Sequence, residues 1–254
     1  MTINVLPGLT YLFLLVFARV GAMAMTLPGI GERGISMRAR LVFALVLALM
    51  MLPLLGNVAD TVPDSLAGMI AGLVREILVG VGIGLSVRLL MGAIQTAATT
   101  IAFQMGLGFA QNLDPTQGVQ GALMSSFMSV LALTLIMATN THHMLIAAIY
   151  DSYTLFPPGA NLPVGDFASM AVESVATAFR IASQIAAPFI VFGIIFYLGM
   201  GIIARLIPQI QVFFVAMPMN IMLGFVLFGL LLGTMMTWFL QFLQGGIAPF
   251  LTGG

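Results

Sequence analysis

Long apolar stretches fill most of this sequence, and they constrain its fold more than any other feature. Hydrophobic residues make up 61% of the 254 positions and charged residues only 6%, whereas about 25% of an ordinary soluble domain is charged. A soluble fold of this size would need more charge to cover its surface. Because a helix needs roughly 20 apolar residues to cross a bilayer, the sequence predicts an all-α membrane protein with several spanning helices.

The first two thirds of the chain divide into five apolar segments and one shorter helix. The segments cover residues 9–28, 41–56, 66–87, 89–110 and 121–138. The shorter helix is predicted from Thr141 to Tyr153, before a Pro-Pro-Gly sequence that stops it. The first segment lacks both a basic leading region and a small-residue cleavage site, so we expect a retained helix rather than a signal peptide.

The last third predicts a long helical hairpin. Asp166 is a suitable N-cap for a helix that continues to Arg205, about 40 residues or roughly 60 Å at the α-helical rise. That length is about twice the hydrocarbon thickness of a bilayer. A turn at Pro208 leads into a second long helix, from Gln209 to residue 244. A hairpin that extends beyond the bilayer suits a protein assembly better than a compact transporter.

Arginines between the segments predict the topology. Arg33, Arg38 and Arg40 place the first loop in the cytoplasm, and Arg88 marks a return to that side. If segments 89–110 and 121–138 both span, Arg205 falls outside, against the positive-inside rule. We therefore expect segment 89–110 and the loop after it to be re-entrant or buried in protein, where irregular backbone is tolerated. The predicted fold is polytopic, with a broken or re-entrant middle segment and a long C-terminal helical hairpin.

Segment 66–87 carries small residues and charges at four-residue spacing. The row consists of Gly68, Gly72, Glu76, Gly80, Gly84 and Arg88. Such a row forms a narrow face that another helix can approach closely, and generic close packing is the simplest interpretation of its glycines.

Three charges lie inside predicted spanning segments: Arg19, Arg75 and Glu76. Adjacent residues on a helix do not face each other, so Arg75 and Glu76 cannot pair together. An unpaired charge near the bilayer centre costs roughly 3 kcal/mol, so each needs a partner elsewhere. We favour a subunit contact for Arg75 and Glu76 over a proton relay, because no second acidic residue lies in a spanning segment.

The helical pattern breaks after segment 89–110. The break contains two glycines, two bulky apolar residues and a turn-forming pair: Gly106, Gly108, Phe109, Leu113, Asp114 and Pro115. It is either an ordinary interhelical turn or a flexible loop whose apolar side chains close a narrow channel to water and ions.

The sequence offers no convincing catalytic or metal-binding set. Cysteine is absent, which excludes thiol nucleophiles, thiolate metal sites and disulfides. His142 and His143 are neighbours that point about 100° apart on a helix; no HxxxH or HExxH pattern accompanies them, so we expect a helix start with Asn140 or Thr141 as its cap. There is no GxSxG sequence and no P-loop. We therefore expect a protein that is not an enzyme and holds no metal or cofactor.

The balance of charges indicates which binding partners to expect. Eight basic residues, all arginine, balance eight acids. Nucleic-acid binding needs a clustered positive excess, so no nucleic-acid partner is expected, and lipid is the predicted surroundings of the apolar helices.

Four stretches resemble the FliR family of type III export-gate subunits, in the same order and at similar positions. They are FARVGAMAMTLPGIGERGISMRARLVFAL, GLGFAQNLDPTQG, NTHHMLIAAIYDSYTLFPPG and IPQIQVFFVAMPMNIMLGF. The third departs from the family pattern at Thr141, where glycine is expected. With the matching length and hydropathy, the resemblance covers essentially the whole chain.

The resemblance implies a non-catalytic subunit of the flagellar protein-export gate, located in the bacterial inner membrane and the flagellar basal body. It implies helical assembly with FliP and FliQ, with FlhB and FlhA nearby, and passive conduction of unfolded flagellar proteins. Residues 1–165 would form a FliP-like portion with a buried loop at 106–120, and residues 166–254 a FliQ-like hairpin. By the same likeness, that loop would be the pore plug, with Phe109 and Leu113 as sealing residues.

Three other functions stay open. A homologous subunit of a virulence type III secretion system would have nearly the same physics, although the paired-histidine and GLGFAQNLDP stretches are closer to the flagellar family. A small-molecule or ion transporter commonly shows internal repeats and a midplane site built from broken helices, and no convincing repeat is found. An intramembrane enzyme would need a nucleophile, metal or acid–base set that the sequence does not offer.

Overall fold

The computed structural model of the protein describes residues 5–32, 34–58, 63, 65–107, 119–158, 164–207 and 212–251. Nearly all of these residues are helical, and none of them lies in a β-strand. Five of the described helices are long and apolar enough to cross a membrane, or six spans result if one bent pair counts as a single span. The predicted all-α polytopic fold is confirmed.

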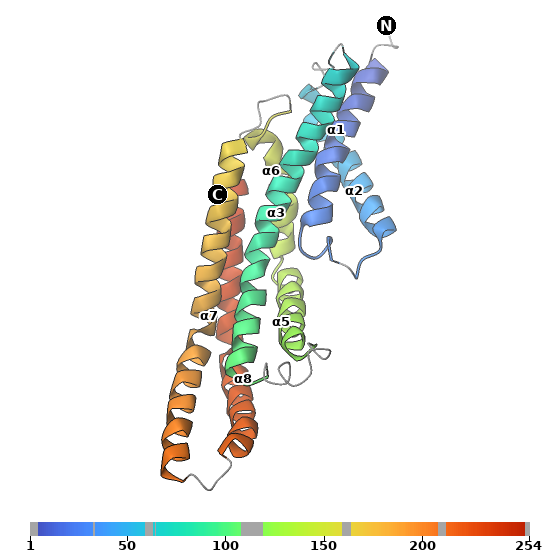
Figure 1. Ribbon diagram of the computed structural model, residues 1–254. Helices are drawn as coiled ribbons and strands as arrows, with labels where there is room; N and C mark the ends of the chain where they lie inside the picture. The colour runs from blue at the N-terminus through green and yellow to red at the C-terminus, as the bar shows by residue number, and fades with distance from the viewer. Residues whose placement is uncertain are drawn as a thin grey trace. The chain divides into compact units, whose positions relative to one another are not determined.

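The elements follow one another along the chain as Figure 1 shows. They are α1 (Val5–Thr26), α2 (Met37–Met51), η1 (Leu52–Val58), α3 (Leu66–Gln104), α5 (Val119–Ala138), α6 (Thr141–Leu155), α7 (Val164–Leu206), α8 (Val212–Ile247) and η3 (Ala248–Phe250).

The chain forms two compact units, each assembled from separate stretches of sequence. The first consists of Met1–Leu90, Thr139–Val175 and Gln244–Gly254. The second consists of Met91–Ala138 and Ala176–Leu243. The division at residue 165 into a FliP-like portion and a FliQ-like hairpin stays a prediction.

The boundary predicted between segments 66–87 and 89–110 is wrong, because α3 is one continuous helix of 39 residues. The prediction divided it at Arg88, which is exposed on the helix. Arginine is a good helix former and, unlike proline, removes no backbone hydrogen bond. The predicted break in the middle of the chain does exist, but as the bent pair of α5 and α6. Arg88 therefore marks no loop between two spans, and its predicted position in a cytoplasmic loop is wrong.

Asn140 forms the break between α5 and α6. Its φ of 58° is left-handed, a conformation that asparagine adopts more readily than most residues. Its side chain makes no capping hydrogen bond, although the amide of His143 donates to its carbonyl over 2.9 Å. The hydroxyl of Thr141 instead accepts a bond of 3.1 Å from the Gln244 side chain. The helix starts where predicted, but Asn140 contributes through its backbone conformation.

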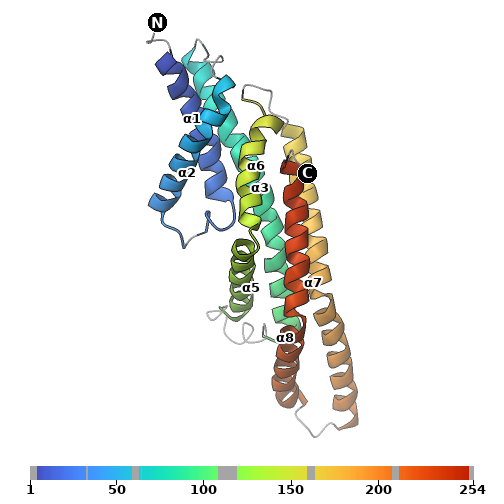
Figure 2. The same ribbon diagram turned by 180° about the vertical axis from the view of Figure 1, so that it is seen from behind.

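The predicted C-terminal hairpin is confirmed. Its helices α7 and α8 have 43 and 36 residues, and within the second unit they lie side by side in opposite directions (Figures 1 and 2). Helix α7 begins at Val164, so Asp166 lies inside its first turn rather than at the cap. The helices also continue through Pro188 and Pro218.

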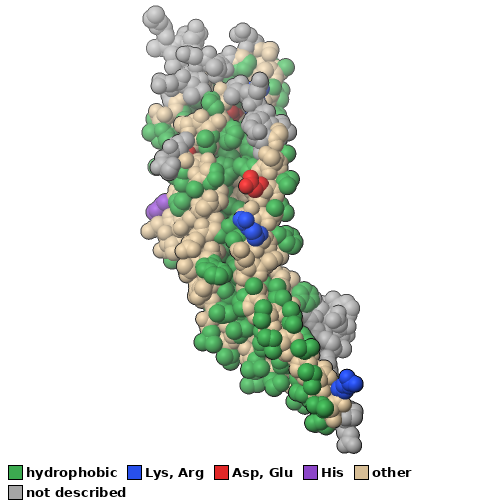
Figure 3. All heavy atoms as spheres, turned by 90° about the vertical axis from the view of Figure 1, so that its left-hand side faces the viewer, with side chains coloured by type: hydrophobic (Ala, Val, Ile, Leu, Met, Phe, Trp, Pro, Cys, Tyr) green, Lys and Arg blue, Asp and Glu red, His purple; other side chains and the backbone are tan. Residues whose placement is uncertain are grey.

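Much of the surface is apolar. On the face in Figure 3, hydrophobic side chains cover large areas and charged ones are few. Val42 and Met50 on α2 are 57% and 67% exposed, and Leu230 on α8 is 77% exposed. A surface of this kind requires lipid or other apolar helices around it.

Candidate functional site

The glycine row of α3 faces α1 within the first unit, and the helices lie side by side in Figures 1 and 2. A Cβ atom added at Gly80 would lie 2.5 Å from the backbone oxygen of Arg19 and 2.9 Å from the Cβ of Ala22. One added at Gly84 would collide with the side chain of Thr26. The row therefore allows the two backbones to approach closely, as small residues do between membrane helices.

The start of the row makes different contacts. A Cβ at Gly72 would meet the hydroxyl of Tyr11, and that hydroxyl donates to the carbonyl of Met69 over 3.3 Å. A Cβ at Gly68 would lie 2.8 Å from the Cβ of Pro63, just before α3 begins. Of the four predicted glycines, Gly72, Gly80 and Gly84 thus face α1, whereas Gly68 packs against the start of its own helix.

A buried ion pair lies in the middle of this helix contact. Arg19 Nε lies 2.6 Å from Glu76 Oε2, and the two side chains are 1% and 2% exposed. Glu76 therefore has its partner in its own chain, and not across a subunit boundary as we favoured from the sequence. Arg75 is half-buried beside it. The sequence contained a signal for the pair: opposite charges near the middle of two predicted spanning segments.

Arg19 also binds the C-terminal end of α6. Its Nη1 donates to the carbonyl oxygen of Ser152 over 2.9 Å and to the hydroxyl of the same residue over 3.3 Å. Its Nη2 donates to the carbonyl of Phe156 over 2.8 Å, and the guanidinium lies 4.1 Å from the ring centre of Tyr153. The carbonyls at a helix C-terminus carry partial negative charge, so one arginine joins α1, α3 and α6. The α6 residues were not among the partners predicted for Arg19.

The C-terminal end of α3 lies in the second unit and carries a glycine motif. Gly106 has a φ of 79°. Its amide donates to the carbonyl of Phe103, and the amide of Leu107 donates to the carbonyl of Ala102, both over 3.0 Å. These two bonds define a Schellman motif, in which glycine relieves the strain of the left-handed residue. The helix therefore ends at a point fixed by its own sequence.

Two predicted sites are only partly described. Of the six residues assigned to the plug, Gly106 is in place at the end of α3, and the others, Gly108, Phe109, Leu113, Asp114 and Pro115, lie outside the described residues. Of the hairpin turn, Arg205 is exposed in the last turn of α7. Pro208 and Gln209 lie outside the described residues.

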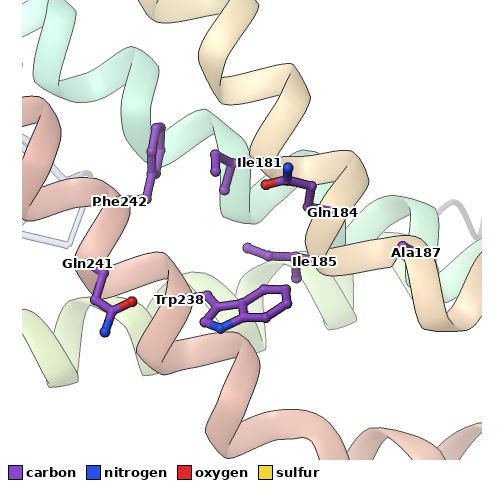
Figure 4. Close-up of a pocket in the computed structure, with 7 residues that line it drawn as sticks. All are labelled: Ile181, Gln184, Ile185, Ala187, Trp238, Gln241 and Phe242. Carbon is purple, nitrogen blue, oxygen red and sulfur yellow. The ribbon is translucent and has the colours of Figure 1, made fainter.

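The second unit contains two hollows with apolar walls. One has a volume of about 420 Å³ and is lined by Leu107, Leu123, Met124, Phe127, Phe225 and Phe228. The other has a volume of about 630 Å³ and lies between α7 and α8, where Trp238 and Ile185 project toward each other (Figure 4). Its lining residues with polar side-chain groups are Gln184 and Gln241, which carry amides, and Trp238, which carries an indole N–H. Neither lining includes a titratable side chain, so neither is suited to acid–base or nucleophilic chemistry.

The paired histidines contact each other. The ring centres of His142 and His143 lie 4.1 Å apart. Their Cα–Cβ bonds diverge on the helix, but rotation about the side-chain bonds can bring neighbouring rings together. Within the described ranges, no three His, Cys, Asp or Glu side chains come together as a metal site would require.

The sequence matches the family model described as bacterial export proteins, family 1, over residues 10–246. The chain belongs to this family. It is 45% identical over 229 residues to the flagellar biosynthetic protein FliR of Caulobacter vibrioides, covering 90% of this chain and 91% of that protein. It is 33% identical over 218 residues to the protein of the same name from Bacillus subtilis, covering 85% and 83% of the two chains.

The Escherichia coli protein of that name is 29% identical over 133 residues, about half of each chain. The resemblance to the FliR family is therefore confirmed. In this bacterial export protein the clusters around Arg19 and Gly106 hold helices together, and we assign them a structural role.

Proposed function

We propose that this chain is a non-catalytic subunit of the flagellar type III export gate. It works in the bacterial inner membrane as part of the flagellar basal body, assembled helically with FliP and FliQ and near FlhB and FlhA. The assembly conducts unfolded flagellar proteins, and other components supply the energy. The observation that carries the proposal is the family match over residues 10–246, with 45% identity to a flagellar biosynthetic protein.

The lengths of the helices support a role in an assembly. At about 1.5 Å per residue, the 43 residues of α7 extend over roughly 65 Å, against a hydrocarbon core of about 30 Å. The helix is nevertheless apolar over most of its length, and Ile194 and Ile195 are exposed by 63% and 65%. Because α7 is about twice as long as the hydrocarbon core is thick, lipid cannot cover all of its apolar surface, and partner helices are needed to cover the rest.

The sealing role is a finer part of the proposal. We assign it to the loop at 106–118, with Phe109 and Leu113 as the side chains that exclude water and ions. The support is the likeness of GLGFAQNLDPTQG to the family's plug, together with the sharp helix end at Gly106 from which this loop starts.

Gene deletion tests the proposed function. We expect a strain without this chain to lose swimming motility and to stop secreting hook and filament proteins, as measured by immunoblot of the culture medium. A plasmid copy should restore both, and an affinity-tagged copy should co-purify with FliP- and FliQ-like proteins. Intact motility and secretion in the deletion strain would reject the flagellar role. Loss of a virulence secretion system alone would favour the homologous subunit.

A loop replacement tests the sealing role separately. Exchanging residues 106–118 for a short glycine–serine linker should raise ion leakage through the membrane while FliP and FliQ still co-purify with the chain. Unchanged leakage in an assembled complex would reject the plug assignment without affecting the export role.

A further inference from the structure

An asparagine lies buried in the apolar helix α8. Asn220 is 2% exposed and belongs to the second unit. Its Nδ2 donates to the backbone oxygen of Gln104 over 3.1 Å and contacts the hydroxyl of Tyr197 over 3.3 Å. A buried amide is unfavourable unless it forms hydrogen bonds, so these contacts to α3 and α7 explain how the side chain is accommodated.

The bond to Gln104 completes the end of α3. The last four carbonyls of a helix have no partner in a following turn. In α3 the carbonyls of Ile101, Ala102 and Phe103 accept hydrogen bonds from the backbone amides of residues that follow the helix. The fourth carbonyl, that of Gln104, accepts a hydrogen bond from Nδ2 of Asn220, which lies 116 positions further along the chain. The local motif therefore terminates the helix, and Asn220 ties that end to α8.

Two glycines on the neighbouring helices make room for the same end. A Cβ added at Gly193 on α7 would collide with the side chain of Gln104. One added at Gly224 on α8 would lie 2.6 Å from the Cγ of Met105 and 3.1 Å from its Cβ. The last residues of α3 are thus held by close contacts on two sides.

Packing alone does not account for an amide at this position. The Oδ1 of Asn220 is buried, and no hydrogen-bond donor to it is found among the described residues. Leucine would fill a similar volume without burying an unsatisfied oxygen. The two contacts through Nδ2 are what an apolar side chain cannot provide.

We propose that Asn220 is a positioning residue that fixes the C-terminal end of α3 against α7 and α8. It thereby sets the place where the chain leaves the helix, at Gly106 and Leu107. The inference rests on the contacts around Gln104 and is independent of the proposed export role.

Cysteine cross-linking tests the proposal, because the chain contains no native cysteine. The test pair is Met105→Cys with Gly224→Cys, whose Cβ atoms would be 3.1 Å apart, near the roughly 3.5–4.5 Å of a disulfide. The control pair is Thr26→Cys with Gly84→Cys in the first unit, with a Cβ separation of 2.9 Å. Replacing Thr26 also removes the hydroxyl that a Cβ at Gly84 would meet. Disulfide formation is followed by mass spectrometry in native membranes, in full-length protein.

Both pairs should form disulfides when Asn220 is present. Asn220→Leu should slow the test pair roughly tenfold, as expected from losing its hydrogen bonds, and leave the control pair unchanged. Asn220→Ser, too short to reach Gln104, should do the same and decides the matter if the leucine variant does not accumulate. Tyr197→Phe, which keeps the Gln104 bond, should have little effect. Parental rates in the leucine or serine variant, or an equal loss at both pairs, would overturn the proposal.

Discussion

Arg19 Nε donates to Glu76 Oε2 over 2.6 Å, and both side chains are almost completely buried. Taking two charges out of water is costly, and their attraction offsets that cost only when the remaining polar atoms are also satisfied. Arg19 meets this condition through the carbonyls of Ser152 and Phe156. The pair is therefore part of a three-helix contact, and its removal should affect α6 as well as α1 and α3.

Removing one member of the pair should be more harmful than removing both. Arg19→Met leaves the Glu76 carboxylate buried without its partner, which costs about 3–5 kcal/mol. The double variant with Glu76→Met removes both charges and should recover a large part of that loss. The measurement is the thermal unfolding midpoint of the detergent-purified protein, together with its amount in membranes. A double variant as unstable as the sum of the two single variants would contradict a direct coupling.

Gly80 should tolerate no side chain. In Gly80→Ala, the new methyl group would lie 2.5 Å from the backbone oxygen of Arg19, and overpacking of this kind costs about 1–3 kcal/mol. Gly92→Ala on the same helix is the matched control, because nothing lies within 4 Å of its added Cβ. Helix propensity alone should make that control more stable by about 1 kcal/mol. Equal unfolding midpoints for the two variants would mean that α1 and α3 are not in close contact at Gly80.

The ring of Tyr153 should matter more than its hydroxyl. The guanidinium of Arg19 lies 4.1 Å from the ring centre, and a buried contact between a cation and an aromatic face contributes about 2 kcal/mol. Among the described residues, the hydroxyl has a single long bond of 3.4 Å, to the carbonyl of Val16. Tyr153→Phe should therefore unfold within a few degrees of the parent, whereas Tyr153→Leu should unfold at a clearly lower temperature. The reverse order would assign the stabilisation to the hydroxyl.

The apolar pattern was sufficient to predict the helices but not their long-range contacts. The starts of α5 and α6 lie within two residues of the predicted positions, because apolar length and glycine or proline breaks are local properties. The division of α3 at Arg88 was wrong for the opposite reason: a charge in an apolar run changes hydropathy but does not interrupt the backbone. Local rules therefore located true breaks and also suggested one that is absent.

The partners of the buried polar groups could not be predicted because they lie far apart in sequence. Glu76 was correctly expected to need a partner, but the choice of Arg19, 57 positions away, depends on how α1 packs against α3. Asn220 was not identified at all, since its role depends on a carbonyl 116 positions away. Four-residue spacing did indicate a close-packing face on α3, and only the structure assigns α1 to it.

Asn140 should be replaceable by glycine but not by a β-branched residue. Its φ of 58° is accessible to glycine without strain and costs most other residues about 1–2 kcal/mol. Since the Asn140 side chain forms no capping bond, Asn140→Gly removes no hydrogen bond and should leave the unfolding midpoint close to that of the parent. Asn140→Val should lower it by several degrees and reduce the amount of protein in membranes.

Thr139→Val is the matched control for Asn140→Val, because it places the same β-branched side chain next to the break without requiring a left-handed backbone. It removes the 2.9 Å contact between the hydroxyls of Thr139 and Thr141, a net loss of about 1 kcal/mol. If the backbone conformation at Asn140 determines the break, Asn140→Val should be the more damaging of the two. A more damaging Thr139→Val would instead assign the break to the threonine pair, and the left-handed residue would be its consequence.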